Sequence, residues 1–162
     1  MPVSATLVSV CFVVNGDKLL MMEHRGGFAK GFWSVLGGRM EPGETPAQAA
    51  VRELQEESGL TATELRQAGY VWLYQVNAIT GMNLFVVTGF TGEIAGSDEG
   101  TPVWVPLADL PHLKHVPYLR PLLDILAPNA FLEGTLTIDS ALSPLAIDLR
   151  QHRMAESRRI TR

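Results

Sequence analysis

Alternating blocks of apolar and polar residues in the first part of the chain predict strands joined by short turns. Residues 6–14 are rich in β-branched and aromatic side chains, which favours a buried strand. The NGD stretch at 15–17 is typical of a hairpin turn, and residues 18–23 return as a second strand. A glycine-rich loop, 24–31, then leads into the apolar stretch 32–36.

Helical periodicity replaces the strand pattern between residues 46 and 58. Thr45 is a natural N-cap, Pro46 suits the first helical position, and Gln48 completes a capping box with Thr45. Gly59 offers a left-handed C-cap. At about 100° per residue the apolar side chains gather on the side predicted to face a sheet: Ala47, Ala50, Val51 and Leu54.

The remainder of the chain returns to the strand pattern. Residues 70–78 and 83–91 are predicted to be paired strands that turn at Thr80-Gly81. Three further elements are a short strand at 103–105, a helix at 118–126 and a strand at 131–138. Strands before and after helices, without regular βαβ alternation, predict an α+β fold with a mixed sheet and helices packed on it.

Composition restricts the class of protein and of partner. The 162 residues fit one domain, and 46% hydrophobic with 19% charged residues is typical of a globular chain. The net charge of −4 argues against a nucleic-acid polymer or an acidic membrane as partner. The apolar opening lacks a basic leader and is too short to span a bilayer, so we expect a cytoplasmic protein. Cys11 has no second cysteine, which excludes an intrachain disulfide and a cysteine-rich zinc site.

Basic residues gather toward the C-terminal end. Against one acid, Glu156, the last positions hold Arg150, Arg153, Arg158, Arg159 and Arg162. We therefore divide the chain into a domain at 1–150 and a basic tail at 151–162. A frayed terminus and an interaction tail both fit this composition.

The predicted helix at 46–58 carries a crowded acidic face. Glu53, Glu56 and Glu57 lie one to four positions apart and centre roughly 115° away from the apolar side. Like charges at i,i+3 and i,i+4 spacings disfavour a helix by about 0.2–0.5 kcal/mol per pair. A solvated surface is the simplest explanation of such a run, so the neighbouring sequence decides its meaning.

The segment GRMEPGETPAQAAVRELQEESGL resembles the Nudix box, which is Gly, five residues, Glu, seven residues and then Arg-Glu-aliphatic-x-Glu-Glu-x-Gly-aliphatic. The specified positions all agree: Gly38, Glu44, Arg52, Glu53, Leu54, Glu56, Glu57, Gly59 and Leu60. The resemblance implies a Nudix fold, a mixed β-sheet sandwiched between helices (α/β/α). It replaces the interpretation of the glutamates as a solvated face.

Four carboxylates near one volume require a cation, or else some of them stay protonated. Oxygen ligands of this kind suit Mg²⁺ or Mn²⁺. Gly37 and Gly38 would let backbone carbonyls approach the metal and the phosphates closely. Arg52 can hold Glu56 in an i,i+4 pair, or form no more than a surface salt bridge.

The resemblance implies hydrolysis of a nucleoside diphosphate linked to another moiety. Water attacks a phosphorus while metal ions offset the charge on the phosphate oxygens. In such a site Glu56 and Glu57 are metal ligands, Glu53 is a ligand or the general base, and Glu44 is a supporting carboxylate. The partner is a nucleotide substrate, and the protein is a monomer or a homodimer.

Outside the box the chain is similar to the branch of the family that hydrolyses oxidised purine nucleoside triphosphates such as 8-oxo-dGTP. The segments GFWSVLGGR and SDEGTPVWVPLADLP carry this likeness, and the second implies that Glu99 lies near the metals. Arg39 is placed to meet a phosphate, with Arg25 or Lys30 in support. Trp33 and Trp72 are candidates for stacking on a base or for core packing.

Two departures from that branch concern recognition of the purine. Ser34 stands where the branch has an asparagine that reads the base, so Ser34 is the substrate-binding candidate here. The stretch LKHVP at 113–117 lacks the paired aspartates of the branch. The groups that would hydrogen-bond an oxidised guanine are therefore missing at both places.

Other interpretations stay open. A hydrolase of nucleoside diphosphate sugars or dinucleoside polyphosphates is the enzymatic alternative, although YQVNA at 74–78 lacks the proline of ADP-ribose-type relatives and Tyr74 matches the second group only loosely. A non-catalytic nucleotide-binding regulator would be expected to lose carboxylates from the box, and none is lost. An isoprenoid diphosphate isomerase needs a reactive cysteine, whereas Cys11 lies in an apolar run.

Overall fold

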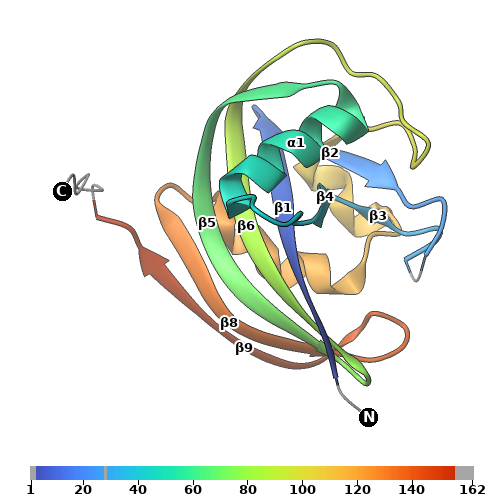
Figure 1. Ribbon diagram of the computed structural model, residues 1–162, viewed down its shortest axis with the longest axis vertical. Coiled ribbons are helices and arrows are strands. Elements are labelled where there is room, and N and C mark those ends of the chain that lie inside the picture. The colour runs from blue at the N-terminus through green and yellow to red at the C-terminus, as the bar shows by residue number, and fades with distance from the viewer. Residues whose placement is uncertain (1–2, 28, 156–162) are drawn as a thin grey trace.

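The computed structural model of the chain describes residues 3–27 and 29–155. Its main feature is one strongly curved sheet, and the strands follow one another across it in the order β3-β2-β1-β6-β5-β8-β9, with β4 paired to β1 and β7 paired to β2 (Figure 1). The strands are β1 (Ser4–Asn15), β2 (Lys18–Glu23), β3 (Trp33–Ser34), β4 (Leu36–Arg39), β5 (Thr61–Gln75), β6 (Ala78–Thr91), β7 (Val103–Pro106), β8 (Ala130–Ile138) and β9 (Pro144–Arg153).

The sheet is mixed, as the sequence predicts. Strand β1 runs parallel to β6, with Val8 opposite Met82, and β5 runs parallel to β8, with Val71 opposite Gly134. The pairs β5–β6, β8–β9, β1–β4 and β1–β2 are antiparallel. The antiparallel pairing of β4 with β1 sets Gly38 opposite Ser9 and Gly37 opposite Val10, so β4, called the glycine strand below, lies next to the middle of the sheet.

Helical segments cover both faces of the sheet. The helix α1 (Pro46–Ser58) lies in front of β1 and β6 in Figure 1, and the 3-10 helices η1 (Leu107–His112) and η2 (Pro117–Leu126) lie behind. Leu54 of α1 packs with Leu36 and Phe85 in one buried cluster. Leu119 of η2 packs with Leu84 in a second cluster on the opposite face. The predicted arrangement of a mixed sheet between helices (α/β/α) is therefore confirmed.

The predicted caps of α1 are confirmed. The Thr45 side chain accepts a hydrogen bond from the backbone N–H of Gln48, and the Gln48 side chain accepts one from Thr45, while Gly59 closes the helix in the left-handed conformation. The predicted buried face is partly wrong. Ala47 is exposed, and the buried positions of the helix are Ala49, Ala50, Leu54, Glu57 and Ser58.

The hairpin between β5 and β6 turns at residues 76–77, so the predicted turn at Thr80-Gly81 is wrong. Gly81 lies inside β6, opposite Trp72. A Cβ at Gly81 would crowd the side chains of Tyr70, Trp72 and Leu7, so the glycine serves close packing and not a turn. The sequence pattern does not separate these two uses of glycine.

Two further elements differ from the sequence prediction. The segment at 117–126 is a 3-10 helix, in which Pro121 cannot supply an N–H for α-helical pairing. Strand β9 continues to Arg153 and pairs there with Ala130, so it crosses the boundary predicted at residue 150. The remaining tail residues, with Glu156, Arg158, Arg159 and Arg162, lie outside the described residues. Within the described part, no helix is long and apolar enough to cross a membrane.

Candidate active site

Arg52 is the centre of a charged network at the outer side of α1. Its Nε and Nη2 donate to the carboxylate of Glu44, and its Nη1 donates to Glu53 at 2.9 Å and to Glu56 at 3.2 Å. Its Nη2 also donates to the carbonyl of Arg39 at 2.9 Å. The predicted Arg52–Glu56 pair is present, but Arg52 also fixes Glu44 and Glu53 and ties the helix to the end of β4.

The hydrogen bonds from Arg52 also set the protonation of Glu44. They hold the pKa of that carboxyl below its usual range, with help from the backbone N–H of Glu41. Glu44 therefore stays ionised in the loop before the helix and supports Arg52 in its position.

Glu57 lies on the buried face of α1, with 5% of its surface exposed, and not on the flank that the sequence predicts. Burial raises the pKa of its carboxyl to about 9, and the charges of Glu99 and Glu53 act in the same direction. A hydrogen bond from the backbone N–H of Gly37 opposes this shift only in part. Such a carboxyl keeps its proton at neutral pH until a cation offsets its charge.

Glu53 lies against the glycine strand. A Cβ at Gly38 would overlap the Glu53 carboxyl, so only glycine at this position lets the acid approach the backbone of β4 so closely. Burial raises the pKa of Glu53, and the hydrogen bond from Arg52 opposes that shift. Gly37 is required for a different reason, because a Cβ there would overlap the carbonyl of Ser9 on β1.

Glu56 and Glu99 are the exposed members of the acidic group. Glu56 points along the outer side of the helix, where Arg52 holds it. Glu99 comes from the turn between Ser97 and Gly100, and its backbone N–H donates to the Ser97 hydroxyl. Although Glu99 is distant from Glu57 in sequence, its charge helps to raise the pKa of the Glu57 carboxyl. This supports the predicted placement of Glu99 beside the box.

The chemistry of these side chains fits a hard divalent cation. The donors are carboxylate oxygens, and burial, with a smaller contribution from neighbouring carboxylates, raises the pKa values of Glu53 and Glu57, so a bound cation would favour their ionised forms. Arg52 fixes Glu44, Glu53 and Glu56 in their present arrangement. In the described residues, no three His, Cys, Asp or Glu side chains are grouped as a ready metal site.

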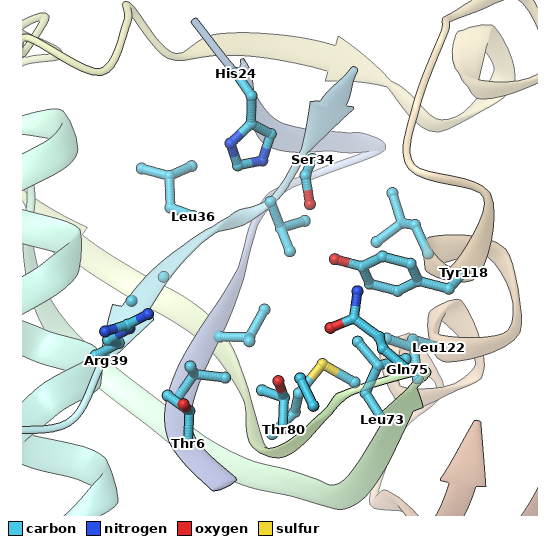
Figure 2. Close-up of a pocket in the computed structure, with 18 of the residues that line it drawn as sticks. Thr6, His24, Ser34, Leu36, Arg39, Leu73, Gln75, Thr80, Tyr118 and Leu122 are labelled. Carbon is cyan, nitrogen blue, oxygen red and sulfur yellow. The ribbon is translucent and has the colours of Figure 1, made fainter. Parts of the chain in front are cut away.

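A cavity of about 420 Å³ opens beside the glycine strand, on the face of the sheet that η2 covers (Figure 2). Gly37, Gly38 and Arg39 form part of its wall. Much of the remaining wall is apolar, with Leu73 and Leu122 among the contributors. The acidic helix and the cavity thus lie on the two sides of one short strand.

Only some of the predicted substrate-binding residues lie at the cavity. Ser34 is buried and lines the cavity, and Arg39 lies at its glycine end. Arg25 and Lys30 are exposed in the loop before β3. Trp33 is partly buried against the core cluster that includes Leu119, and among the described residues it does not contribute to the cavity wall.

Trp72 lies elsewhere. It meets Tyr70 edge to face, with ring centroids 5.3 Å apart, on the wall of a second, open hollow with Glu133 and Arg150. Cys11 is fully buried, and burial raises the pKa of its thiol to about 12, so it is inert as the sequence predicts.

Sequence reasoning missed several polar residues of the cavity, among them His24, Gln75, Thr80 and Tyr118. They come from the loop after β2, from the β5–β6 hairpin and from η2, so no local motif connects them. A signal existed only for Gln75, because strict alternation along β5 places it on the same face as the buried Leu73 and Val71. The misplaced hairpin turn obscured that signal.

An Arg-Glu-x-x-Glu-Glu helix seated on a glycine strand of a mixed sheet defines the protein as a hydrolase of the Nudix fold. The chain belongs to the NUDIX family, since the NUDIX domain profile matches residues 5–125, well over half of the chain. Because the chain belongs to this family and its relatives include nucleotide hydrolases, it is a pyrophosphohydrolase that acts on nucleotides.

Two relatives share the name oxidized purine nucleoside triphosphate hydrolase. The one from Danio rerio is 34% identical over 110 residues, and the one from Mus musculus is 30% identical over 110 residues. Each match covers 67% of this chain and 70% of the relative. The chain is thus similar to the branch that its sequence resembles outside the box.

Solved structures agree on the fold. The MutT protein of Bacillus halodurans superposes with a TM-score of 0.77 over 93% of this chain and 99% of that one, at 23% identity. The E. coli ORF135 protein gives a TM-score of 0.62 at 26% identity, over 76% of this chain and 89% of that one. The first likeness shows the fold alone, because its identity is low.

Proposed function

We propose that the chain is a Mg²⁺-dependent hydrolase, also active with Mn²⁺, that cleaves the diphosphate linkage of a nucleoside triphosphate. One observation carries the proposal: the carboxyl groups of Glu53 and Glu57 lie against the backbone of Gly37 and Gly38, and the same strand forms a wall of the cavity. One side of this strand suits phosphates with their cations, and the other suits a ring-sized group.

The side chains divide the work as follows. Bound Mg²⁺ would supply charge neutralisation for the phosphate oxygens and for the carboxylates that hold it. Glu57 and Glu56 are the ligand candidates, together with Glu99, whose charge acts on Glu57. Glu53 is fixed between Arg52 and Gly38, which suits a further ligand or the base that takes the proton of the attacking water. Arg39 is exposed at the glycine end, within reach of a phosphate.

The substrate class follows from the relatives. Those from Danio rerio and Mus musculus are named as hydrolases of oxidised purine nucleoside triphosphates. This supports a nucleoside triphosphate over a nucleoside diphosphate sugar or a dinucleoside polyphosphate, and a role in cleansing the nucleotide pool.

A substrate panel tests the proposal. Nucleoside triphosphates, 8-oxo-dGTP, ADP-ribose and diadenosine polyphosphates are incubated with Mg²⁺ or Mn²⁺, and the released products are quantified. We expect nucleoside monophosphate and pyrophosphate from a triphosphate. Glu57→Gln should reduce turnover by several orders of magnitude, while the exposed Glu64→Gln, outside the site, should not. Full metal-dependent turnover by Glu57→Gln, or products only from ADP-ribose or diadenosine polyphosphates, would contradict the proposal.

A further inference from the structure

The cavity beside β4 determines what the site can recognise beyond the phosphates. Its wall includes Gly37, Gly38 and Arg39, so a substrate whose phosphates lie at the glycine strand can extend its attached group into this space. A volume of about 420 Å³ is in the range of small-molecule sites and suits a nucleobase. The inference that follows rests on the function proposed above.

The cavity offers almost no formal charge to a bound group. Its lining contains no carboxylate among the described residues, and Arg39 at the glycine end is the one charged side chain there. Burial lowers the pKa of the His24 imidazole, which favours its neutral form. A base in the deeper part would therefore be recognised by neutral hydrogen bonds and apolar contact.

Two neutral polar side chains line the cavity from two different elements, β5 and η2. Gln75 is the last residue of β5, and Tyr118 comes from the first turn of η2. Figure 2 shows the Gln75 amide and the Tyr118 ring both directed into the cavity. The described residues give neither side chain a hydrogen-bond partner, so both groups are free to bind a ligand.

The amide of Gln75 has a particular pairing property. It presents one acceptor and one donor side by side, and rotation about its last bond exchanges their places. It can therefore pair with the C=O and N–H edge of guanine and, after rotation, with the amino and ring-nitrogen edge of adenine. The Tyr118 hydroxyl can also donate or accept. A carboxylate has no such freedom, because it only accepts.

We infer that Gln75 and Tyr118 are the specificity-determining residues of the cavity and that they let it accept guanine-type and adenine-type bases with similar affinity. The phosphates are held on the other side of β4. Base tolerance is thus a property of the cavity, separate from the acidic helix that carries the hydrolytic chemistry.

Binding of dGMP and dAMP to the metal-free protein, followed by NMR titration, tests this inference without catalysis. The wild-type protein should bind the two within about tenfold of each other. Gln75→Leu removes both hydrogen bonds and should weaken both nucleotides about five- to fiftyfold. Tyr118→Phe should weaken both by a smaller factor, about two- to tenfold.

Gln75→Glu gives the sharpest contrast. Its carboxylate accepts from the two N–H groups on one edge of guanine, but it meets a ring acceptor on adenine. It should therefore favour dGMP over dAMP by about tenfold or more. The matched control is Tyr74→Phe, because Tyr74 is exposed on the opposite face of β5, and its affinities should equal those of the wild-type protein.

The outcomes separate the inference from the proposed function. Unchanged affinities in Gln75→Leu, Gln75→Glu and Tyr118→Phe, with triphosphate hydrolysis intact, would overturn the inference and leave the function standing. A strong wild-type preference for one base would overturn it as well. A wild-type protein that neither binds nor hydrolyses any nucleotide would remove the proposed function and the inference with it. Melting curves of each variant confirm folding, and Tyr118→Phe serves where a Gln75 variant does not fold.

Discussion

Glu57 occupies a position that a helix packed on a sheet would ordinarily give to an apolar residue. It lies next to the buried Ser58 on the inner face of α1, and the pKa of its carboxyl, about 9, is well above that of an ordinary glutamate. Burial without a counter-charge destabilises the ionised form, so the fold keeps the group protonated. The destabilisation at this residue is consistent with a group held ready for a cation.

The stability of the metal-free protein should therefore fall as the pH rises. The pKa of Glu57 is about 9 in the folded protein against 4.5 ordinarily, so between these values the folded state binds more protons than the unfolded state. Stability is highest below about pH 4.5 for this group and is lost progressively toward pH 9. Glu57→Gln should remove this slope and stabilise the protein by roughly 1–3 kcal/mol at pH 8.

Urea unfolding at several pH values, in the presence of a chelator, measures this effect. The matched control is Glu64→Gln, whose carboxylate is exposed. Equal pH dependence in the wild-type protein and Glu57→Gln would show that the Glu57 carboxyl is not held in its neutral form.

At the scale of elements, local rules explain α1 better than they explain its neighbours. The capping box of Thr45 and Gln48 and the Gly59 cap depend only on adjacent residues, and all were predictable from sequence. The orientation of the helix depends on the sheet, and here prediction was partly wrong, since Ala47 is exposed and Glu57 is buried. An amphipathic pattern cannot identify a carboxyl that is buried for chemical reasons.

Substitutions on α1 test this corrected orientation. Leu54 is fully buried between the helix and the sheet, so Leu54→Ala should cost about 2–5 kcal/mol of unfolding free energy through a cavity. Ala47→Ser should change it by less than about 0.5 kcal/mol, because Ala47 is exposed. Denaturant unfolding measures both, and a large loss from Ala47→Ser would return the helix to the orientation predicted from sequence.

At the scale of the whole molecule, the sequence predicted the acidic helix and its hydrolytic function but not the cavity beside β4. The box residues lie in one continuous segment, so their spacing alone identifies the family and the acidic helix. Gln75 of β5 and Tyr118 of η2 line the same cavity only because η2 packs on this face of the sheet. Contacts of this kind depend on the complete fold and have no local signature.

The C-terminal strand shows the same dependence on distant contacts, and truncation tests it. The last residues of β9 complete the sheet edge: Gln151, His152 and Arg153 pair with Leu132, Phe131 and Ala130. The His152 ring also contacts the Glu133 carboxylate at 2.9 Å, and the Met154 N–H donates to Asn129. A chain ended after Arg150 loses these backbone hydrogen bonds, whereas one ended after Ala155 keeps them.

We therefore expect the 1–150 protein to melt several degrees below the 1–155 protein, because each lost backbone hydrogen bond removes about 0.5–1.5 kcal/mol. His152→Ala in the full chain is the matched control. It removes only the exposed side-chain contact with Glu133 and should lower stability by less than about 1 kcal/mol. Calorimetric melting compares the three. Equal melting temperatures for the two truncated chains would mean that residues 151–155 lie outside the cooperative unit, as a tail beginning at 151 requires.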